Sequence, residues 1–317
     1  MRLTSLATVQ GAVRAGSWAG SWAGSGRVAD RLLVSELRGG ARRSLGLMSL
    51  VVLGVPWDAN SSHLYGCAAG PAAIRAALHS GSGNDATEHG LNIVAELTDL
   101  GDLELQNAVG DLDANWADAD VITNAIDAQI AAGNRVISLG GDHAVTYPIL
   151  RGVAKHHPKL TVVHIDAHPD MYDDFEGNPL SHASPFARAL EDGCMQRLVQ
   201  LGIRTATTHS YEQADRFGVQ MIGARQLDQF DASALDGPIY LTVDLDGLDP
   251  AVAPGVSHHE PGGITVRELL DMIDALPGPI VGADIVELNP SRDLVDMTAM
   301  VGAKLLKEIA GRMLTVG

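Results

Sequence analysis

The segment "VVHIDAHPDMYDD" (residues 162–174) combines four acids and two histidines with β-branched residues that are typical of a buried strand. An uncompensated carboxylate in such a strand is very unfavourable, so something must balance the charge. Asp166, His168 and Asp170 are spaced by two residues and point to one face if the chain stays extended. Carboxylate oxygens and imidazole nitrogens that converge on one point suit a hard or borderline divalent cation.

Three other segments end a β-branched run with polar residues of the same kinds. Asp142 and His143 follow "SLGG", Asp244 and Asp246 follow "LTV", and Glu287 follows "GADIV". Each signal alone is weak, because a strand-end aspartate is commonly a helix cap and "GGDH" also suits a tight turn. "DLD" also matches the acidic pair that holds a metal–sugar nucleotide in some glycosyltransferases. Together, the four strand ends would place acids and histidines at one edge of a sheet.

The elements that position these residues follow from alternating strand and helix patterns. The expected strands are residues 50–55, 93–97, 135–139, 160–165, 198–203, 219–222, 239–245 and 280–286. The expected helices are residues 118–132, 145–156, 185–191, 266–275 and 297–313. Such alternation predicts an α/β fold with a parallel sheet that is covered on both faces. Ligands bind at the carboxyl ends of the strands in such sheets, where the charged residues lie.

The composition restricts the partners and the compartment. The 317 residues are 46% hydrophobic, which is ample for a core, and carry a formal net charge of -17. This charge argues against nucleic acid and anionic membranes as partners and favours a cationic small molecule. Cys67 and Cys194 are the two cysteines, which make no disulfide framework and fit a reducing compartment. No apolar run approaches the roughly 18 residues that cross a bilayer.

Residues 1–47 differ in composition from the rest of the chain. They hold seven arginines, two acids and no lysine, and they repeat "SWAG". We expect a disordered or leader extension here, or an upstream start with Met48 as the true first residue. An Arg-rich, Ser-rich, acid-poor leader is also the composition of an organellar transit peptide. The expected catalytic domain is 48–317, and the expected location is cytoplasmic, with organellar import as the alternative if the leader is genuine.

A series of motifs resembles the ureohydrolase family, which contains the arginases and agmatinases. The motifs are "GGDHAVTYP", "HIDAHPD", "GNPLSHASPFAR", "VDLDGLDPAVAPG", "EPGGIT" and "GADIVELNP". The resemblance covers roughly residues 51–314 and is strongest to the plant arginase type, through "FEGN", "SHAS", "APGVSH" and "NPSRD". It implies a three-layer α/β/α fold with a mostly parallel eight-stranded sheet. It also implies two Mn²⁺ ions per subunit and a homotrimer or homohexamer, although the same ligand types accept Ni²⁺ or Co²⁺.

By this resemblance, six ligands hold two ions in sets that share two aspartates. One ion would be held by His143, Asp166, Asp170 and Asp244, and the other by His168, Asp166, Asp244 and Asp246. Four aspartates balance the charge of two divalent ions. A hydroxide shared by the ions would leave a site of net charge about -1 that suits a guanidinium.

The resemblance also assigns roles in catalysis and substrate binding. The residue that matches Asp170 transfers a proton to the leaving amine, and His182 matches a loop histidine that moves protons to bulk water. Glu287 would pair with the substrate guanidinium, since a bare carboxylate is unfavourable at the end of a buried strand. His258 and Asn178 complete the expected substrate contacts, together with His182 and Glu287.

Other polar residues near these motifs have simpler interpretations. His164 has the same parity as the ligands but lies deeper in the strand, so we expect a hydrogen-bonded core histidine. Asp142 is expected to support a ligand and not to bind metal. Cys67 is expected to be a small buried filler, and the acidic run at Asp173 and Asp174 to be solvated or to attract a cation.

The expected function is a binuclear manganese hydrolase that releases urea from L-arginine or agmatine. The animal arginase pattern has an α-carboxylate-binding Asn where this chain has Tyr172, and many agmatinases have "PGTGTP" where this chain has "PGVSHHEP". Guanidinobutyrate, guanidine and formiminoglutamate therefore remain alternative substrates. Two other classes are a one-zinc deacetylase-type enzyme, which six ligands disfavour, and a non-catalytic family member.

Overall fold

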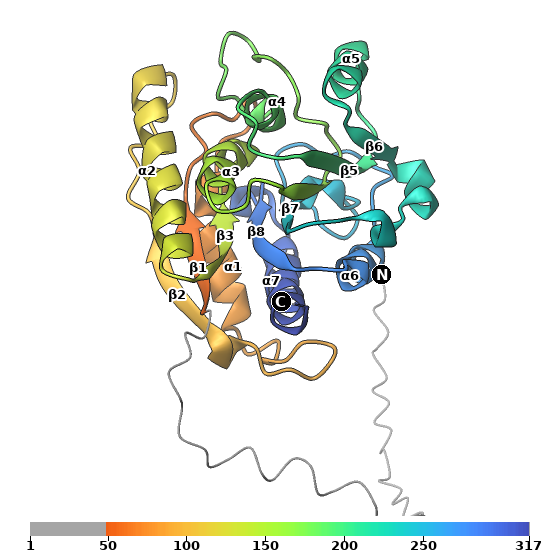
Figure 1. Cartoon of the computed structure of the whole chain (residues 1–317). Coiled ribbons are helices and arrows are strands. Elements are labelled where there is room, and N and C mark those ends of the chain that lie inside the picture. Colours follow the sequence, from red (N-terminus) through yellow and green to blue (C-terminus); the bar gives the residue numbers. More distant parts are fainter. Residues whose placement is uncertain (1–48, 317) are drawn as a thin grey trace, which may run out of the picture. The chain divides into compact units, whose positions relative to one another are not determined.

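Eight parallel strands form one sheet in residues 49–316, the part of the chain that the computed structural model describes (Figure 1). The strands are β1 (Leu50–Val55), β2 (Leu97–Asp102), β3 (Arg135–Gly140), β4 (Thr161–Ile165), β5 (Arg197–Ile203), β6 (Gln220–Gly223), β7 (Ile239–Asp244) and β8 (Ile280–Val286). Their order in the sheet is β2-β1-β3-β8-β7-β4-β5-β6, and every neighbouring pair is parallel. The predicted eight-stranded parallel sheet is confirmed.

Two groups of helices cover the two faces of this sheet. One face carries α1 (Gly70–Leu78), α6 (Val266–Ala275) and α7 (Met297–Thr315), and the other carries α2 (Leu112–Ala131), α3 (Thr146–Ala154), α4 (Pro185–Glu191) and α5 (Thr208–Phe217). Strand β1 shows the cause, because successive side chains of a strand point to opposite faces. Leu50 and Val52 pack in the core on the α1 side, whereas Val51 and Leu53 pack on the α2 side. The three-layer α/β/α prediction is confirmed.

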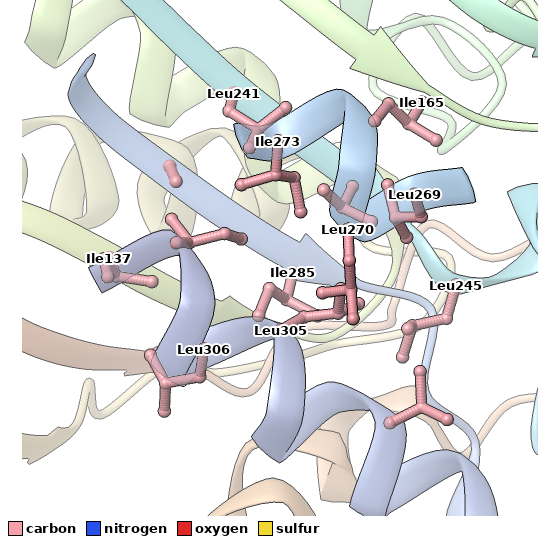
Figure 2. Packing of buried hydrophobic residues seen from close by; sticks show 14 of the residues in the cluster. Ile137, Ile165, Leu241, Leu245, Leu269, Leu270, Ile273, Ile285, Leu305 and Leu306 are labelled. Carbon is pink, nitrogen blue, oxygen red and sulfur yellow. The ribbon is translucent and has the colours of Figure 1, made fainter. Parts of the chain in front are cut away.

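Helix α6 illustrates how local sequence and packing cooperate. Thr265 accepts a hydrogen bond from the Glu268 backbone N–H, and the Glu268 carboxylate accepts one from the Thr265 N–H, which forms a capping box. Leu269, Leu270 and Ile273 then occupy one side of the helix, and burial of each contributes about 1.5–3 kcal/mol. Figure 2 shows them beside Ile285, Leu305 and Leu306.

The structure corrects the predicted elements at several places. The strand predicted at residues 93–97 is wrong, because Val94–Glu96 is a 3₁₀ helix and β2 begins at Leu97. The sequence of β2, "LTDLGD", is largely polar because this strand lies at the sheet edge and its residues are mostly exposed. Helix α2 begins at Leu112 after an Asp111 cap and not at 118, and α1 and α5 were not predicted. The helices predicted at 185–191 and 266–275 are confirmed.

The four strands that precede the charged motifs are neighbours in the centre of the sheet. Their order is β3-β8-β7-β4, so their carboxyl ends lie side by side although they are far apart in sequence. A Cβ on Gly247 would lie 2.9 Å from the Asp166 backbone nitrogen, so the segment after β7 approaches β4 closely only with glycine there. The fold therefore brings the candidate residues to one place.

The predicted extension at residues 1–47 lies outside the described residues. Among residues 49–316, no helix combines the length and the apolar character that crossing a membrane requires.

Candidate metal centre

Residues that follow two strands, β4 and β7, surround one ring nitrogen of His143, which itself follows β3. Its Nδ1 lies 3.0 Å from Asp166 Oδ2, 3.0 Å from Asp170 Oδ2 and 3.2 Å from Asp244 Oδ2. Burial lowers the pKa of His143, but the three carboxylates beside its ring outweigh burial and raise that pKa well above its usual value. Three carboxylate oxygens and one buried imidazole nitrogen that converge in this way fit a divalent cation.

A second group of donors adjoins the first through Asp166. His168 Nδ1 lies 3.5 Å from Asp166 Oδ1 and 3.1 Å from Asp246 Oδ2. The two oxygens of Asp166 therefore face different groups, Oδ2 towards His143 and Oδ1 towards His168. Burial and then the charge of Asp166 raise the pKa of Asp246 to about 7, because a neighbouring carboxylate disfavours its ionisation.

Only one carboxylate oxygen of Asp244 faces a candidate histidine ligand. Its Oδ2 faces His143, whereas its Oδ1 accepts a 2.7 Å hydrogen bond from the Asp246 backbone N–H. The structure thus brings together all six predicted ligands. Among these six residues, Asp166 is the one whose two oxygens face both histidines, His143 and His168.

Two site residues have backbone conformations that are unfavourable for residues with a side chain. Asp170 has φ 49° and Glu287 has φ 64°, both in the left-handed region. Such residues persist where surrounding contacts determine the conformation, and they cluster at functional sites. Both carboxylates line the pocket described below.

His164 holds Asp166 from the side away from the pocket. Its Nε2 lies 2.7 Å from Asp166 Oδ2, and its Nδ1 accepts from Gln200 Nε2 at 3.0 Å. Gln200 also donates to the Pro169 carbonyl at 2.6 Å. Complete burial lowers the pKa of His164, so the neutral ring donates its Nε2 proton to Asp166. The prediction of a hydrogen-bonded core histidine is confirmed, while the supporting role of Gln200 was not foreseen.

Asp142 organises a loop next to the ligands. Its carboxylate accepts hydrogen bonds from the Asn60 N–H, the Ser61 hydroxyl and the Ala144 N–H, each at 3.1 Å. Burial raises the pKa of Asp142 to about 8. Because these contacts fix the backbone around His143, Asp142 supports the site as predicted.

His182 and Glu287 form a buried pair beside the ligands. His182 Nδ1 lies 2.8 Å from Glu287 Oε1, which also accepts from the His143 backbone N–H at 3.0 Å. Burial lowers the pKa of His182, but hydrogen bonding to Glu287 and its charge raise it to about 9. Burial raises the pKa of Glu287, but hydrogen bonding to His182 and its charge bring it to about 2. Both groups are therefore charged near neutral pH.

Two further side chains contact this pair. The Cys67 thiol donates to Glu287 Oε2 at 3.2 Å, and the Ser62 hydroxyl lies 2.8 Å from His182 Nε2. Cys67 is fully buried, as predicted for a filler, but its contact with Glu287 was not expected. Ser62 gave no signal in the sequence, because an isolated serine in a loop is ordinary.

A pocket of about 200 Å³ opens over these residues. It is lined by Ser62, His168, Pro169, Asp170, Tyr172, Phe175, His182, Ala183, Thr205, Ser210, Asp244, Asp246, His258 and Glu287. The His258 ring centroid lies 5.2 Å from that of His182 and 5.7 Å from that of His168. A larger pocket of about 380 Å³ between α6, α7 and residues 87–91 contains none of the candidate residues, so the chemistry points to the smaller one.

Two predicted contributors do not reach the pocket wall. Asn178 donates to Asn60 Oδ1 at 3.1 Å and accepts from the Leu180 N–H at 2.9 Å, so its amide holds the loop. Asp173 accepts from Gln213 Nε2 at 2.7 Å, away from the pocket lining. Phe175, Thr205 and Ser210 line the pocket but were not predicted, because they come from two loops and the first turn of α5, whose meeting depends on the fold.

The comparisons with known proteins agree with this geometry. Residues 48–311 match the model of the Arginase family. The "Arginase 1, mitochondrial" of Arabidopsis thaliana is 43% identical over 295 residues, covering 88% of this chain and 83% of that protein. An agmatinase of Bacillus anthracis is 33% identical over 274 residues, covering 82% and 90%. The solved arginase from Medicago truncatula superposes with a TM-score of 0.77 at 39% identity, covering 84% of this chain and 87% of that one.

The fold, the cluster of histidines and aspartates and these matches define a metal-dependent hydrolase of guanidino C–N bonds. The chain belongs to the arginase family.

Proposed function

We propose that this arginase-family hydrolase holds two manganese ions and releases urea from L-arginine or agmatine. The observation that carries the proposal is Asp166, whose two oxygens face two separate donor groups. One ion would be held by His143, Asp166, Asp170 and Asp244, and the second by His168, Asp166, Asp244 and Asp246. Nickel or cobalt would suit the same donors and is the alternative.

The donor set supports two ions over one. Four aspartates and two histidines lie within a few ångströms, and that number of acids in a buried place needs about four positive charges. When bound, such a pair of ions supplies a water whose proton is lost near neutral pH. A deacetylase-type site with one zinc would leave part of this set without a role.

Glu287 is proposed to bind the guanidinium of the substrate. It is buried and charged at the bottom of the pocket, and its carboxylate can accept two parallel hydrogen bonds from a guanidinium. The carboxylate of Glu287 is already paired with His182, so a bound guanidinium would compete with His182 for it. That competition would release His182 to take part in proton transfer.

His182 and Asp170 are proposed to move protons. His182 holds a proton at Nδ1 near neutral pH, and its Nε2 contacts Ser62 at the exposed edge of the pocket. Asp170 lies within the pocket lining, where a departing amine would need a proton. The two residues therefore offer a proton donor inside the site and a route towards its exterior.

The pocket lining supports a substrate without a distal negative charge. It contains no lysine or arginine, and its upper part consists of hydroxyl, aromatic and imidazole groups. A terminal carboxylate such as that of guanidinobutyrate would find no lysine or arginine there. Arginine adds an amine beside its carboxylate, and agmatine has no carboxylate, so these two substrates fit better. His258 is the proposed contact for the distal end.

A substrate panel tests the function. Purified protein with Mn²⁺ would be given L-arginine, agmatine, guanidinobutyrate, guanidine and formiminoglutamate, and urea and formamide would be measured. We expect urea, with arginine or agmatine the best substrate by kcat/KM. Formamide as the only product would replace the substrate assignment. The absence of any product from protein that contains two ions would favour a non-catalytic family member.

Assembly and location are also proposals. The family resemblance supports a homotrimer or homohexamer, which the mass in solution would distinguish. The names of plant relatives include the word mitochondrial, which supports an import function for residues 1–47 as the alternative to a cytoplasmic location. A reporter fused to residues 1–47 that stays in the cytoplasm would contradict import.

A further inference from the structure

The guanidinium of Arg204, which follows β5, forms six hydrogen bonds in residues 49–316, and every acceptor is a backbone carbonyl. A guanidinium has five N–H groups, so six contacts use all of its donors. The acceptors are the carbonyl groups of Gly202, Asp246, Gly247, Leu248 and Glu260. Arg204 therefore connects backbone segments instead of pairing with an acid.

Two of these segments carry candidate site residues. Asp246 is a candidate metal ligand, and Glu260 lies two residues after His258 in the loop of residues 254–261, which we call the substrate loop. Arg204 Nη2 donates to the Asp246 carbonyl at 2.7 Å and to the Glu260 carbonyl at 2.6 Å, and Nε donates to Glu260 at 2.9 Å. A single planar group thus joins the ligand segment to the substrate loop.

The backbone of Arg204 is tied to a third segment of the site. Its N–H donates to the Ala167 carbonyl at 2.9 Å, and Ala167 lies between Asp166 and His168. The Ala167 N–H donates in turn to Asp246 Oδ1 at 3.3 Å. Arg204 therefore contacts both segments that carry His168 and Asp246, the two residues proposed to bind only the second ion.

Gly263 lets the chain after the substrate loop pack against this guanidinium. A Cβ on Gly263 would lie 2.7 Å from Arg204 Nη2 and 2.7 Å from the backbone carbonyl carbon of Leu248, which is closer than van der Waals contact allows. The next residue, Ile264, donates its N–H to the Gly247 carbonyl at 3.1 Å. The ligand segment and the end of the substrate loop are therefore in direct contact beside Arg204.

The number and spread of these contacts require an arginine. A guanidinium carries its five N–H groups on three nitrogens in one rigid plane, whereas a lysine ammonium has three N–H groups on one atom. Lysine would keep the charge of Arg204 but could not reach the same carbonyl groups from one position. The charge and the geometry of this side chain can therefore be separated by one substitution.

We propose that Arg204 is a positioning residue that holds the ligand segment of Asp246 and the substrate loop of His258 in a fixed relation to each other. Arg204 touches neither an ion nor the substrate in this account. The inference rests on the proposed function, because it assumes that Asp246 binds an ion. Groups that support a metal ligand typically change metal affinity by about 10- to 100-fold when they are replaced.

Four variants separate this role from a general effect on stability. Arg204→Lys removes the planar group, and Gly263→Ala keeps it but pushes the chain away from it. Arg197→Lys is the matched control, because Arg197 begins the same strand, β5, and donates to the Ala234 carbonyl at 2.7 Å outside the pocket. Asp246→Ala removes the ligand through which Arg204 is proposed to act.

The first measurement is amide hydrogen exchange of the full-length protein. We expect the peptides that cover residues 254–264 to lose protection in Arg204→Lys and in Gly263→Ala, because the contacts that hold the substrate loop are weakened. The same peptides should exchange as in the wild type in Arg197→Lys. Thermal unfolding of every variant reports which of them remain folded.

The second measurement is a manganese titration of the same proteins, with free Mn²⁺ followed by its electron paramagnetic resonance signal. We expect two ions in the wild type and in Arg197→Lys, and one of the two weakened about 10- to 100-fold in Arg204→Lys and Gly263→Ala. In Asp246→Ala, the ion that remains should bind equally tightly with and without Arg204→Lys. A general loss of stability would weaken that remaining ion as well.

Three results would overturn the inference alone while the wild type still binds two ions. The first is unchanged protection of residues 254–264 in Arg204→Lys, and the second is unchanged affinity for both ions in that variant. The third is a weaker remaining ion when Arg204→Lys is added to Asp246→Ala. If Arg204→Lys does not fold, Gly263→Ala takes its place in each comparison. A wild-type protein that binds no manganese would overturn the proposed function together with this inference.

Discussion

The floor and the rim of the pocket are built in different ways. The floor consists of His143, Asp166, His168, Asp170, Asp244 and Asp246, and the rim consists of Ser62, Tyr172, Phe175, Thr205, Ser210 and His258. Floor residues lie at the ends of central strands and all except His168 are buried. The rim comes from separate loops and the first turn of α5, and all of its residues except Ser210 are exposed or half-buried. The floor therefore has little freedom to vary, and the rim can change without disturbing it.

The contacts of the two regions show the same contrast. Asp166 in the floor is held by His164 and by the His168 backbone N–H, which donates at 2.6 Å. Tyr172 in the rim stacks on His209 with ring centroids 5.3 Å apart, a contact between two partly exposed side chains. We propose that the floor determines the reaction class and that the rim determines the substrate.

The largest effect should come from substitution of Asp166, the floor residue that faces both donor groups. Asp166→Asn removes the charge that faces both donor groups, so we expect loss of both ions and no detectable urea from any substrate. Metal per subunit would be measured by mass spectrometry of the purified protein. Asp249→Asn is the control, because Asp249 accepts backbone hydrogen bonds outside the pocket. Two ions in Asp166→Asn would contradict the account.

A smaller effect should come from the ion pair of His182 and Glu287, which lies beside the floor residues. The raised pKa of His182 contributes stability that is fully present below about pH 6.5 and is lost as the pH rises through about 9. The lowered pKa of Glu287 contributes stability that is present above about pH 4.5 and is lost as the pH falls through about 2. In metal-free protein, His182→Gln should therefore be less stable than wild type near pH 6. The difference should shrink as the pH passes 9.

Denaturant unfolding at several pH values measures this difference. A deficit in His182→Gln that stays constant from pH 6 to pH 10 would show that the ion pair does not carry the stability. Glu287→Gln removes the other charge of the pair. Its loss of stability should also shrink as the pH rises through about 9, because both variants lose the same ion pair with His182.

The smallest effect should come from the rim. His258→Ala removes an imidazole from the pocket wall without touching a floor carboxylate, so we expect two bound ions and a folded protein. The ratio of kcat/KM for arginine to that for agmatine should change by a factor equivalent to about 0.5–1.5 kcal/mol, the contribution of one hydrogen bond. Loss of metal in this variant would mean that floor and rim are not separable.

The floor could be predicted from the sequence because its residues lie close together in the chain, directly after apolar strands. Asp166, His168 and Asp170 follow one apolar strand at fixed spacing, and Asp244 and Asp246 follow another. The parallel sheet then requires the carboxyl ends to lie at one edge, so the convergence followed from the strand pattern and the motif resemblance together. The left-handed backbone at Asp170 and Glu287 gave no sequence signal, because neither is a glycine.

The rest depended on contacts between distant segments. Strand β2 was misplaced because an exposed edge strand lacks the apolar run that marks a central one. Asn178 was expected at the substrate, but its amide is used by Asn60, which lies in a loop far away in sequence.

A manganese titration of activity tests the central claim most directly. Metal-free protein would be given increasing Mn²⁺ while bound metal and urea formation are measured on the same samples. The account predicts that urea formation from arginine or agmatine reaches its plateau only as the second ion per subunit binds. Full urea formation by verified metal-free protein, or a plateau at one ion per subunit, would contradict it.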